Sequence, residues 1–107
     1  MMHKIKEKGF MNHFKIVTPR EAVKLAATGN YVVIDLREKE EYEKGHLEYA
    51  VSMPDAKVNE IEKYNLKNKQ WLLYCSRGNL SFRLASKLTR MGYQVWAVGG
   101  PIDEVLK

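Results

Sequence analysis

Short apolar runs alternate with amphipathic segments along this chain. The runs are rich in β-branched and aromatic residues, and several are bounded by glycine, proline or short polar residues, which is typical of strands buried in a sheet. The clearest of them is Tyr-Val-Val-Ile at 31–34. The strands predicted in this way cover residues 14–17, 31–34, 50–54, 71–74 and 94–98.

In most of the intervals between these strands, apolar residues recur at helical spacing, which predicts helices there. The first helix has the clearest start, because Thr18 can cap it, Pro19 suits its first position, and Glu21 can close a capping box. Gly29 is predicted to end it. The helix after residue 79 has the apolar positions Leu80, Leu84, Ala85, Leu88 and Met91. Further helical segments are predicted at 38–44, 55–64 and 102–106.

The alternation of strands and helices predicts the fold class. Such an order is typical of an α/β domain with a parallel sheet and helices on both of its faces. The 107 residues suit one domain, which we assign to residues 14–107. Residues 1–13 are charged and have no clear period, so we predict a flexible N-terminal extension.

Cys75 occupies the most informative position in the chain. It follows the strand at 71–74 and precedes a helix, so its sulfur is predicted to lie near helix amides that lack intrahelical partners. These amides, together with the charge of Arg77, would stabilise a thiolate, and Gly78 would allow a tight turn. The alternative is that Cys75 is an inert core residue at the end of a strand.

Two charged residues follow a different predicted strand. Asp35 and Arg37 come directly after the run at 31–34, and sites in parallel sheets form beyond the carboxyl ends of strands. Both also have a structural interpretation, since an aspartate often caps a turn and the two can form an ion pair. We favour the structural role for Asp35, because a carboxylate in contact with a thiolate would oppose its ionisation.

Composition narrows the classes of function. The formal net charge is +5, but the lysines are spread along the chain, which favours a solvated surface over a specific nucleic-acid site. No apolar stretch is long enough to cross a bilayer and none follows the basic N-terminus, so we expect a soluble protein without a secretion signal. A single cysteine fits a reducing cytoplasm. His3 and His13 have no ligands at metal-binding spacing, so no metal is predicted.

Three stretches carry motifs that occur together, in the same order, in one family. The stretch at 35–54 begins with Asp-Leu-Arg and contains Glu-Tyr and Gly-His-Leu before its proline. The stretch at 74–81 reads Tyr-Cys-Ser-Arg-Gly-Asn-Leu-Ser, and residues 98–100 read Val-Gly-Gly. From residue 14 to its end the chain resembles the rhodanese family of sulfurtransferases.

The resemblance implies a single domain with a five-stranded parallel sheet and no cofactor. It implies that Cys75 takes a sulfane sulfur from thiosulfate, 3-mercaptopyruvate or a protein persulfide, and passes it to an external thiol or another nucleophile. His46, Asp35 and Arg37 would brace the cysteine loop. The loop amides that would hold the transferred sulfur belong to Ser76, Arg77, Gly78, Asn79, Leu80 and Ser81.

The cysteine loop departs from the family pattern at two positions. Many members carry arginine where this chain has Ser76 and Leu80. Because arginine binds oxyanions in a bidentate manner, the loss predicts poorer use of thiosulfate. Arg77 and Arg83 are the candidates to compensate.

Two other classes of function compete with sulfur transfer. A cysteine phosphatase or arsenate reductase would need an arginine six positions after the cysteine, where this chain has Ser81. A slow or non-catalytic rhodanese-like module could serve binding or regulation, and its partner surface is not encoded in any motif.

Overall fold

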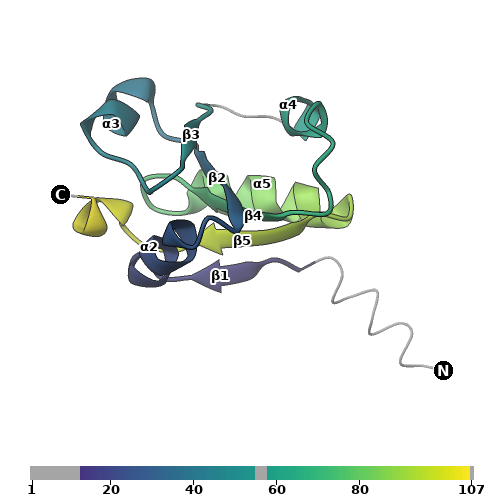
Figure 1. The fold of residues 1–107 in the computed structure, drawn as a ribbon, viewed down its shortest axis with the longest axis horizontal. Coiled ribbons are helices and arrows are strands. Elements are labelled where there is room, and N and C mark those ends of the chain that lie inside the picture. Colours follow the sequence, from purple (N-terminus) through teal and green to yellow (C-terminus); the bar gives the residue numbers. More distant parts are fainter. Residues whose placement is uncertain (1–12, 55–57, 107) are drawn as a thin grey trace.

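The five strands form one parallel sheet, as the alternation of elements predicts (Figure 1). The structure is a computed structural model that describes residues 13–54 and 58–106. The spatial order of the strands is β1-β5-β4-β2-β3. Their bounds are Lys15–Val17 for β1, Tyr31–Asp35 for β2, Val51–Ser52 for β3, Gln70–Tyr74 for β4 and Gln94–Val98 for β5. All but one residue of the predicted extension over 1–13 lies outside the described residues.

The helices occupy the predicted intervals, with changes at their ends. The element at the C-terminus is a 3₁₀ helix, η1, and not an α-helix. The predicted helix at 55–64 ends two residues earlier than expected, at Glu62, and residues 55–57 lie outside the described residues. The bounds are Pro19–Ala27 for α2, Lys39–Lys44 for α3, Val58–Glu62 for α4, Asn79–Arg90 for α5 and Ile102–Val105 for η1.

The predicted capping box at the start of α2 is confirmed. The amide of Glu21 donates to Thr18 Oγ1 at 3.1 Å, and the amide of Thr18 donates to the Glu21 carboxylate at 2.9 Å. Two backbone amides at the helix start thereby have hydrogen-bond partners. Pro19 has no backbone N–H, so the first helical position leaves no donor without a partner. The entry of the chain into α2 is fixed by local sequence alone.

Hydrophobic cores cover both faces of the sheet. Side chains alternate along β4, so that Trp71 and Leu73 pack into one core and Leu72 and Tyr74 into the other. The first core is completed by α4 and α5, and the second by α2 and η1. Helices therefore lie on both sides of the sheet, as predicted, with α5 behind it and α2 in front of it in Figure 1.

One apolar position predicted for α5 is largely exposed. Leu80 was expected on the apolar face of the helix, but 43% of its surface is exposed. The reason is that Ser81, and not Leu80, is the residue of the first turn that faces the sheet: it is 0% exposed and donates to the Val98 carbonyl of β5 at 3.4 Å. Leu84, Ala85 and Leu88 are buried as predicted.

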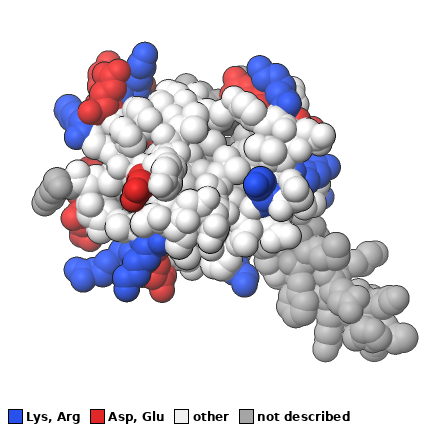
Figure 2. All heavy atoms as spheres, in the orientation of Figure 1, with Lys and Arg blue, Asp and Glu red and all other residues white. Residues whose placement is uncertain are grey.

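Charged side chains do not gather into one basic surface on the face seen in Figure 2. Lysine and arginine side chains are interspersed with carboxylates and lie mainly near its margin. Within residues 13–54 and 58–106, no helix has the length and apolarity needed to span a bilayer.

Candidate active site around Cys75

Cys75 lies at the carboxyl end of β4 on the side of the sheet that α5 covers. Parallel pairing sets Asp35 opposite Tyr74, so Leu36 follows on β2 where Cys75 follows on β4. Because side chains alternate, Leu36 and Cys75 belong to the core under α5, whereas Tyr74 packs into the opposite core. The thiol and the carboxylate of Asp35 are thus held on different faces, and the structural role favoured for Asp35 agrees with this placement.

The loop between β4 and α5 bends back over the sulfur. The amide of Gly78 donates to Cys75 Sγ at 3.1 Å, and the Ser81 hydroxyl oxygen lies 3.8 Å from the same sulfur. Gly78 has φ = 119°, a left-handed conformation that residues with a Cβ rarely adopt. The predicted role of this glycine in a tight turn is therefore confirmed.

The carbonyl groups of the loop are held from outside by the segment after β5. Ile102 donates its amide to the Ser76 carbonyl at 3.2 Å, and Gly100 donates its amide to the Arg77 carbonyl at 3.1 Å. In a trans peptide the N–H points opposite to the C=O, so the amides of Arg77 and Gly78 face the inside of the loop. The segment at 99–102 thus orients amides toward the sulfur.

A buried ion pair supports the neighbouring strand end. Arg37 binds the Asp35 carboxylate through two nitrogens, with Nη2–Oδ2 at 2.8 Å and Nε–Oδ1 at 3.1 Å. Burial opposes the charge of Arg37, but the hydrogen bond and the charge of Asp35 outweigh it, and the pKa of the guanidinium is raised. The guanidinium also donates to the Gly45 carbonyl at 2.6 Å and lies 3.5 Å from the Asp103 carboxylate in η1.

Tyr74 belongs to the same network, although no sequence pattern singled it out as a site residue. Its hydroxyl accepts the amide of Leu47 at 3.0 Å and is hydrogen-bonded to Asp35. Burial, together with the hydrogen bond and negative charge of Asp35, raises the pKa of Tyr74 above the ordinary tyrosine range. The role of this tyrosine depends on the pairing register, which local sequence does not specify.

His46 was predicted to brace the cysteine loop, but the contacts of its ring are with Tyr42 in α3. Its ring stacks on Tyr42 at 3.9 Å between centroids, and Nδ1 donates to the Tyr42 carbonyl at 2.8 Å. The histidine is exposed and stabilises the end of α3. Its effect on the cysteine loop stays a prediction.

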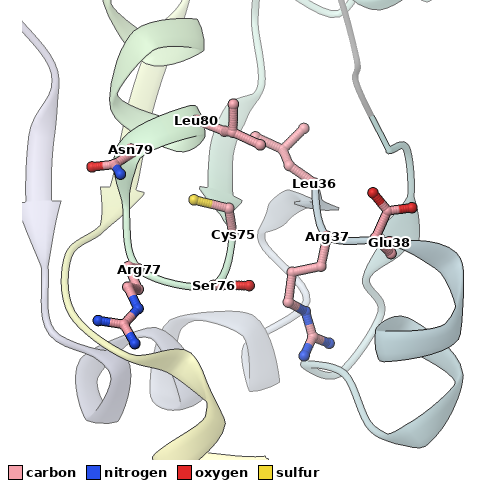
Figure 3. A pocket seen from close by; sticks show the side chains of 8 residues that line it. All are labelled: Leu36, Arg37, Glu38, Cys75, Ser76, Arg77, Asn79 and Leu80. Carbon is pink, nitrogen blue, oxygen red and sulfur yellow. The ribbon is translucent and has the colours of Figure 1, made fainter.

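A cavity of about 250 Å³ opens beside Cys75 (Figure 3). Four of the predicted loop residues line it together with Cys75 and Arg37, whereas Gly78 and Ser81 do not. The sequence interpretation missed Leu36 and Glu38, which join the cavity because β2 and β4 are neighbours. The lining residues are Leu36, Arg37, Glu38, Cys75, Ser76, Arg77, Asn79 and Leu80.

Neither arginine named as a compensating cation is directed at the sulfur. Arg77 lines the cavity, but its side chain extends away from Cys75 Sγ (Figure 3). Arg83 is exposed and does not line the cavity. Ser81 stands six positions after the cysteine, where a phosphatase would need an arginine. Its hydroxyl donates to the Gly78 carbonyl at 3.1 Å, and its side chain carries no positive charge. Across the described ranges, no three histidine, cysteine or acidic residues are grouped as metal ligands.

Comparison with curated proteins finds relatives that are named for sulfur transfer. A thiosulfate sulfurtransferase GlpE of Coxiella burnetii is 30% identical over 81 residues, which are 76% of each chain. A GlpE of Pseudomonas entomophila is 30% identical over 94 residues, covering 87% of this chain and 85% of that protein. A probable molybdopterin-synthase adenylyltransferase of Porphyra purpurea is 36% identical over 75 residues, but the match spans only 20% of its length.

Solved structures and a family model agree with these relatives. A rhodanese-related protein from Thermoplasma volcanium superposes with a TM-score of 0.71 at 21% identity, covering 88% of this chain and 96% of that one. At this identity the likeness concerns the fold alone. The model of the rhodanese-like domain matches residues 18–106, nearly all of the described chain. This protein therefore belongs to the family of rhodanese-like domains.

Proposed function

We propose that this protein is a sulfurtransferase that carries a sulfane sulfur on Cys75. The observation that carries the proposal is the position of the Cys75 sulfur, which accepts the Gly78 amide inside a loop of inward-facing amides and lies beside an open cavity. Relatives named thiosulfate sulfurtransferase support the same assignment. The unit that would perform the transfer is the domain assigned to residues 14–107.

The reaction needs two displacements at sulfur. In the first, the Cys75 thiolate attacks the outer sulfur of the donor, a new S–S bond forms, and the bond that held this sulfur in the donor breaks. That bond is a sulfur–sulfur bond in thiosulfate or a persulfide. In 3-mercaptopyruvate it is a carbon–sulfur bond, whose carbon keeps the electron pair and takes up a proton. With thiosulfate as the donor, sulfite leaves with the electron pair of the sulfur–sulfur bond. In the second, an acceptor thiolate attacks the outer sulfur of the Cys75 persulfide, and Cys75 leaves as a thiolate.

The loop would stabilise the charge that these steps place on the outer sulfur. Amides that face the loop interior need no reorganisation when an anionic sulfur arrives, and the partial positive charge at the start of α5 adds to them. Because Cys75 is the only cysteine in the chain, the acceptor thiol must come from another molecule. We propose a reducing compartment such as the cytoplasm, where such thiols are available.

Intact-protein mass spectrometry tests the proposal directly. We expect the chain to gain one sulfur atom after incubation with a sulfane donor, and to lose it again when a small thiol is added. Three donors cover the proposed range: thiosulfate, 3-mercaptopyruvate and an alkyl persulfide. A Cys75→Ser variant, which keeps a similar volume, should gain no sulfur. No gain with any donor, or an equal gain in the variant, would refute the proposal.

A second candidate function is a binding or regulatory module that does not turn over. The observation that favours it is the match to a fifth of a larger adenylyltransferase, where a domain of this kind is one part of a longer chain. The Cys75→Ser variant separates the two candidates in cells. Full function without the thiol would favour the binding module, whereas loss of function in a folded variant would favour sulfur transfer.

A further inference from the structure

The cavity beside Cys75 has one apolar wall. The side chains of Leu36, which follows β2, and Leu80, in the first turn of α5, point toward each other near Cys75 (Figure 3). Leu36 is 5% exposed and belongs to the core, so it cannot turn away from this position without exposing apolar surface. Leu80 is 43% exposed in the first turn of α5, where nothing in the core requires a leucine. An apolar ligand beside the sulfur would cover the exposed part of Leu80.

The charges that line the cavity do not suit a small dianion. The guanidinium of Arg37 is 3% exposed, is bound to Asp35 and lies 3.5 Å from the Asp103 carboxylate. Arg77 extends away from Cys75 Sγ (Figure 3). Glu38 also lines the cavity, and its carboxylate points away from Cys75 as well. An incoming oxyanion would therefore meet no cation directed at the sulfur.

From this arrangement we infer that the physiological donor is a persulfide on an uncharged alkyl carbon, with the alkyl group held between Leu36 and Leu80. This inference rests on the proposed function, because it names the donor class for the same thiol. A cysteine persulfide in a protein and a small aliphatic persulfide share this chemistry. Thiosulfate and persulfides with an added carboxylate are outside the class.

The proposed step balances without any further reagent. The Cys75 thiolate attacks the outer sulfur of R–S–SH, the S–S bond of the donor breaks, and R–S⁻ leaves with its electron pair. The outer sulfur keeps its proton and becomes the terminal sulfur of the Cys75 persulfide. No atom is oxidised or reduced overall, since one sulfur–sulfur bond replaces another.

A matched pair of donors tests the inference on the natural chain. Butyl persulfide and the persulfide of 4-mercaptobutyrate have the same reacting group and the same three methylenes, and differ only in a terminal methyl or carboxylate. We expect butyl persulfide to load Cys75 at least about tenfold faster, a typical effect of apolar complementarity in a pocket. Equal rates, or a faster reaction of the carboxylate donor, would overturn the inference and leave the sulfurtransferase function intact. Failure of all donors to load Cys75 would refute both.

Variants at Leu80 test the apolar wall itself. Because Leu80 is largely exposed, Leu80→Arg and Leu80→Gln should both fold, which circular dichroism can verify. Leu80→Arg should raise the rate with thiosulfate about tenfold and lower the rate with butyl persulfide. Leu80→Gln, the uncharged control, should lower the rate with butyl persulfide without raising that with thiosulfate. If Leu80→Arg changes neither rate, the wall plays no part in donor selection and the inference fails.

A third arm separates the two sources of the donor. A short peptide with blocked termini and a single cysteine persulfide carries the same alkyl-bound sulfur on a polypeptide. Loading from this peptide as fast as from butyl persulfide supports a protein donor, and loading at least tenfold slower supports a small aliphatic donor. A rate with thiosulfate that exceeds the rates with both persulfides would overturn the inference.

Discussion

Arg37 connects three separate segments of the chain through a single guanidinium. It pairs with Asp35 at the end of β2, donates to the Gly45 carbonyl after α3 and lies 3.5 Å from Asp103 in η1. Burial of both charges in the Asp35–Arg37 pair makes this arrangement sensitive to the loss of either partner, because the remaining charge would be left uncompensated.

We expect Asp35→Asn to lower the free energy of unfolding by about 3 kcal/mol, because it leaves the buried guanidinium without its anion. Urea denaturation at neutral pH measures this change. Asp103→Asn is the matched control, since this carboxylate is 68% exposed and its loss should cost less than about 1 kcal/mol. A similar cost for the two variants would contradict the special role of the buried pair.

Tyr74 gives the fold a predictable dependence on alkaline pH. Its pKa is raised in the folded protein, so the folded state keeps the phenol protonated where the unfolded chain begins to lose the proton. The stabilising contribution of Tyr74 is therefore complete below the ordinary tyrosine pKa of about 10 and is lost as the pH rises above it.

Replacement of Tyr74 by phenylalanine should remove this dependence. At neutral pH, Tyr74→Phe should cost about 1 to 2 kcal/mol, because the Leu47 amide and Asp35 lose a buried partner. The difference in unfolding free energy between the two proteins should shrink between pH 9 and pH 11. Urea denaturation across this range measures it, and a constant difference would count against the raised pKa of Tyr74.

Single residues differ in how far their roles could be predicted. Cys75 and Gly78 could be selected from the order strand, thiol, polar loop and helix, because that order fixes where the sulfur lies relative to free amides. Leu36, Glu38 and Tyr74 could not, since their roles arise from the register in which β2 pairs with β4. The direction of Arg77 was equally out of reach, because it depends on packing around an exposed side chain.

At the scale of elements, the loop between β4 and α5 depends on a glycine that also contacts the sulfur. A Cβ on Gly78 would lie 3.3 Å from the Val98 carbonyl oxygen, at a φ of 119° that already disfavours it. Gly92, after α5, has φ = 97°, and an added Cβ there would meet nothing within 4 Å. A residue with a Cβ would therefore be strained at either position, but only Gly78 donates its amide to Cys75.

We expect Gly78→Ala and Gly92→Ala each to cost about 1 to 3 kcal/mol of stability through backbone strain. Only Gly78→Ala should also slow the gain of sulfur by Cys75, by about tenfold or more, since loss of a single preorganised donor has effects of this size or larger. Single-turnover loading, followed by mass spectrometry, measures this rate. An equal slowing in Gly92→Ala would mean that general destabilisation, and not the amide, is responsible.

The elements themselves were largely predictable where local chemistry determines them. The start of α2 agreed with prediction because its capping box needs only residues three apart in sequence. The end of the chain was predicted as a short helix of unspecified type. It is a 3₁₀ helix, in which the amides of Glu104 and Leu106 donate to carbonyls three residues earlier. Leu80 was counted among the apolar positions of α5, and helical periodicity does not indicate which residue of the first turn faces the sheet.

At the scale of the whole molecule, the central strand β4 is buried on both faces. Leu72 and Leu73 are neighbours in sequence and 0% exposed, yet they belong to different cores. The parallel sheet therefore depends on two separate layers of helices, and loss of packing on either side should weaken it.

Leu72→Ala and Leu73→Ala should each lower the free energy of unfolding by about 2 to 5 kcal/mol, because each leaves a cavity in a closed core. Thermal and urea denaturation measure both. Leu80→Ala is the matched control and should cost less than about 1 kcal/mol, as its side chain is 43% exposed. A small effect of either core variant would mean that one face of the sheet is less tightly packed than described.

The pairing of β1 with β5 also determines when the site can form during synthesis. Lys15 aligns with Trp96, so the first strand made has no partner until the last strand is complete. The carbonyls of Ser76 and Arg77 likewise wait for the amides of Ile102 and Gly100, which are translated more than 20 residues after the loop that they hold. Contacts between such distant positions form late, because the intervening chain must already be ordered. A chain that stopped before residue 99 would thus carry Cys75 without its oriented amides, and reactivity of the thiol would arise only after residues 99–102 had been added.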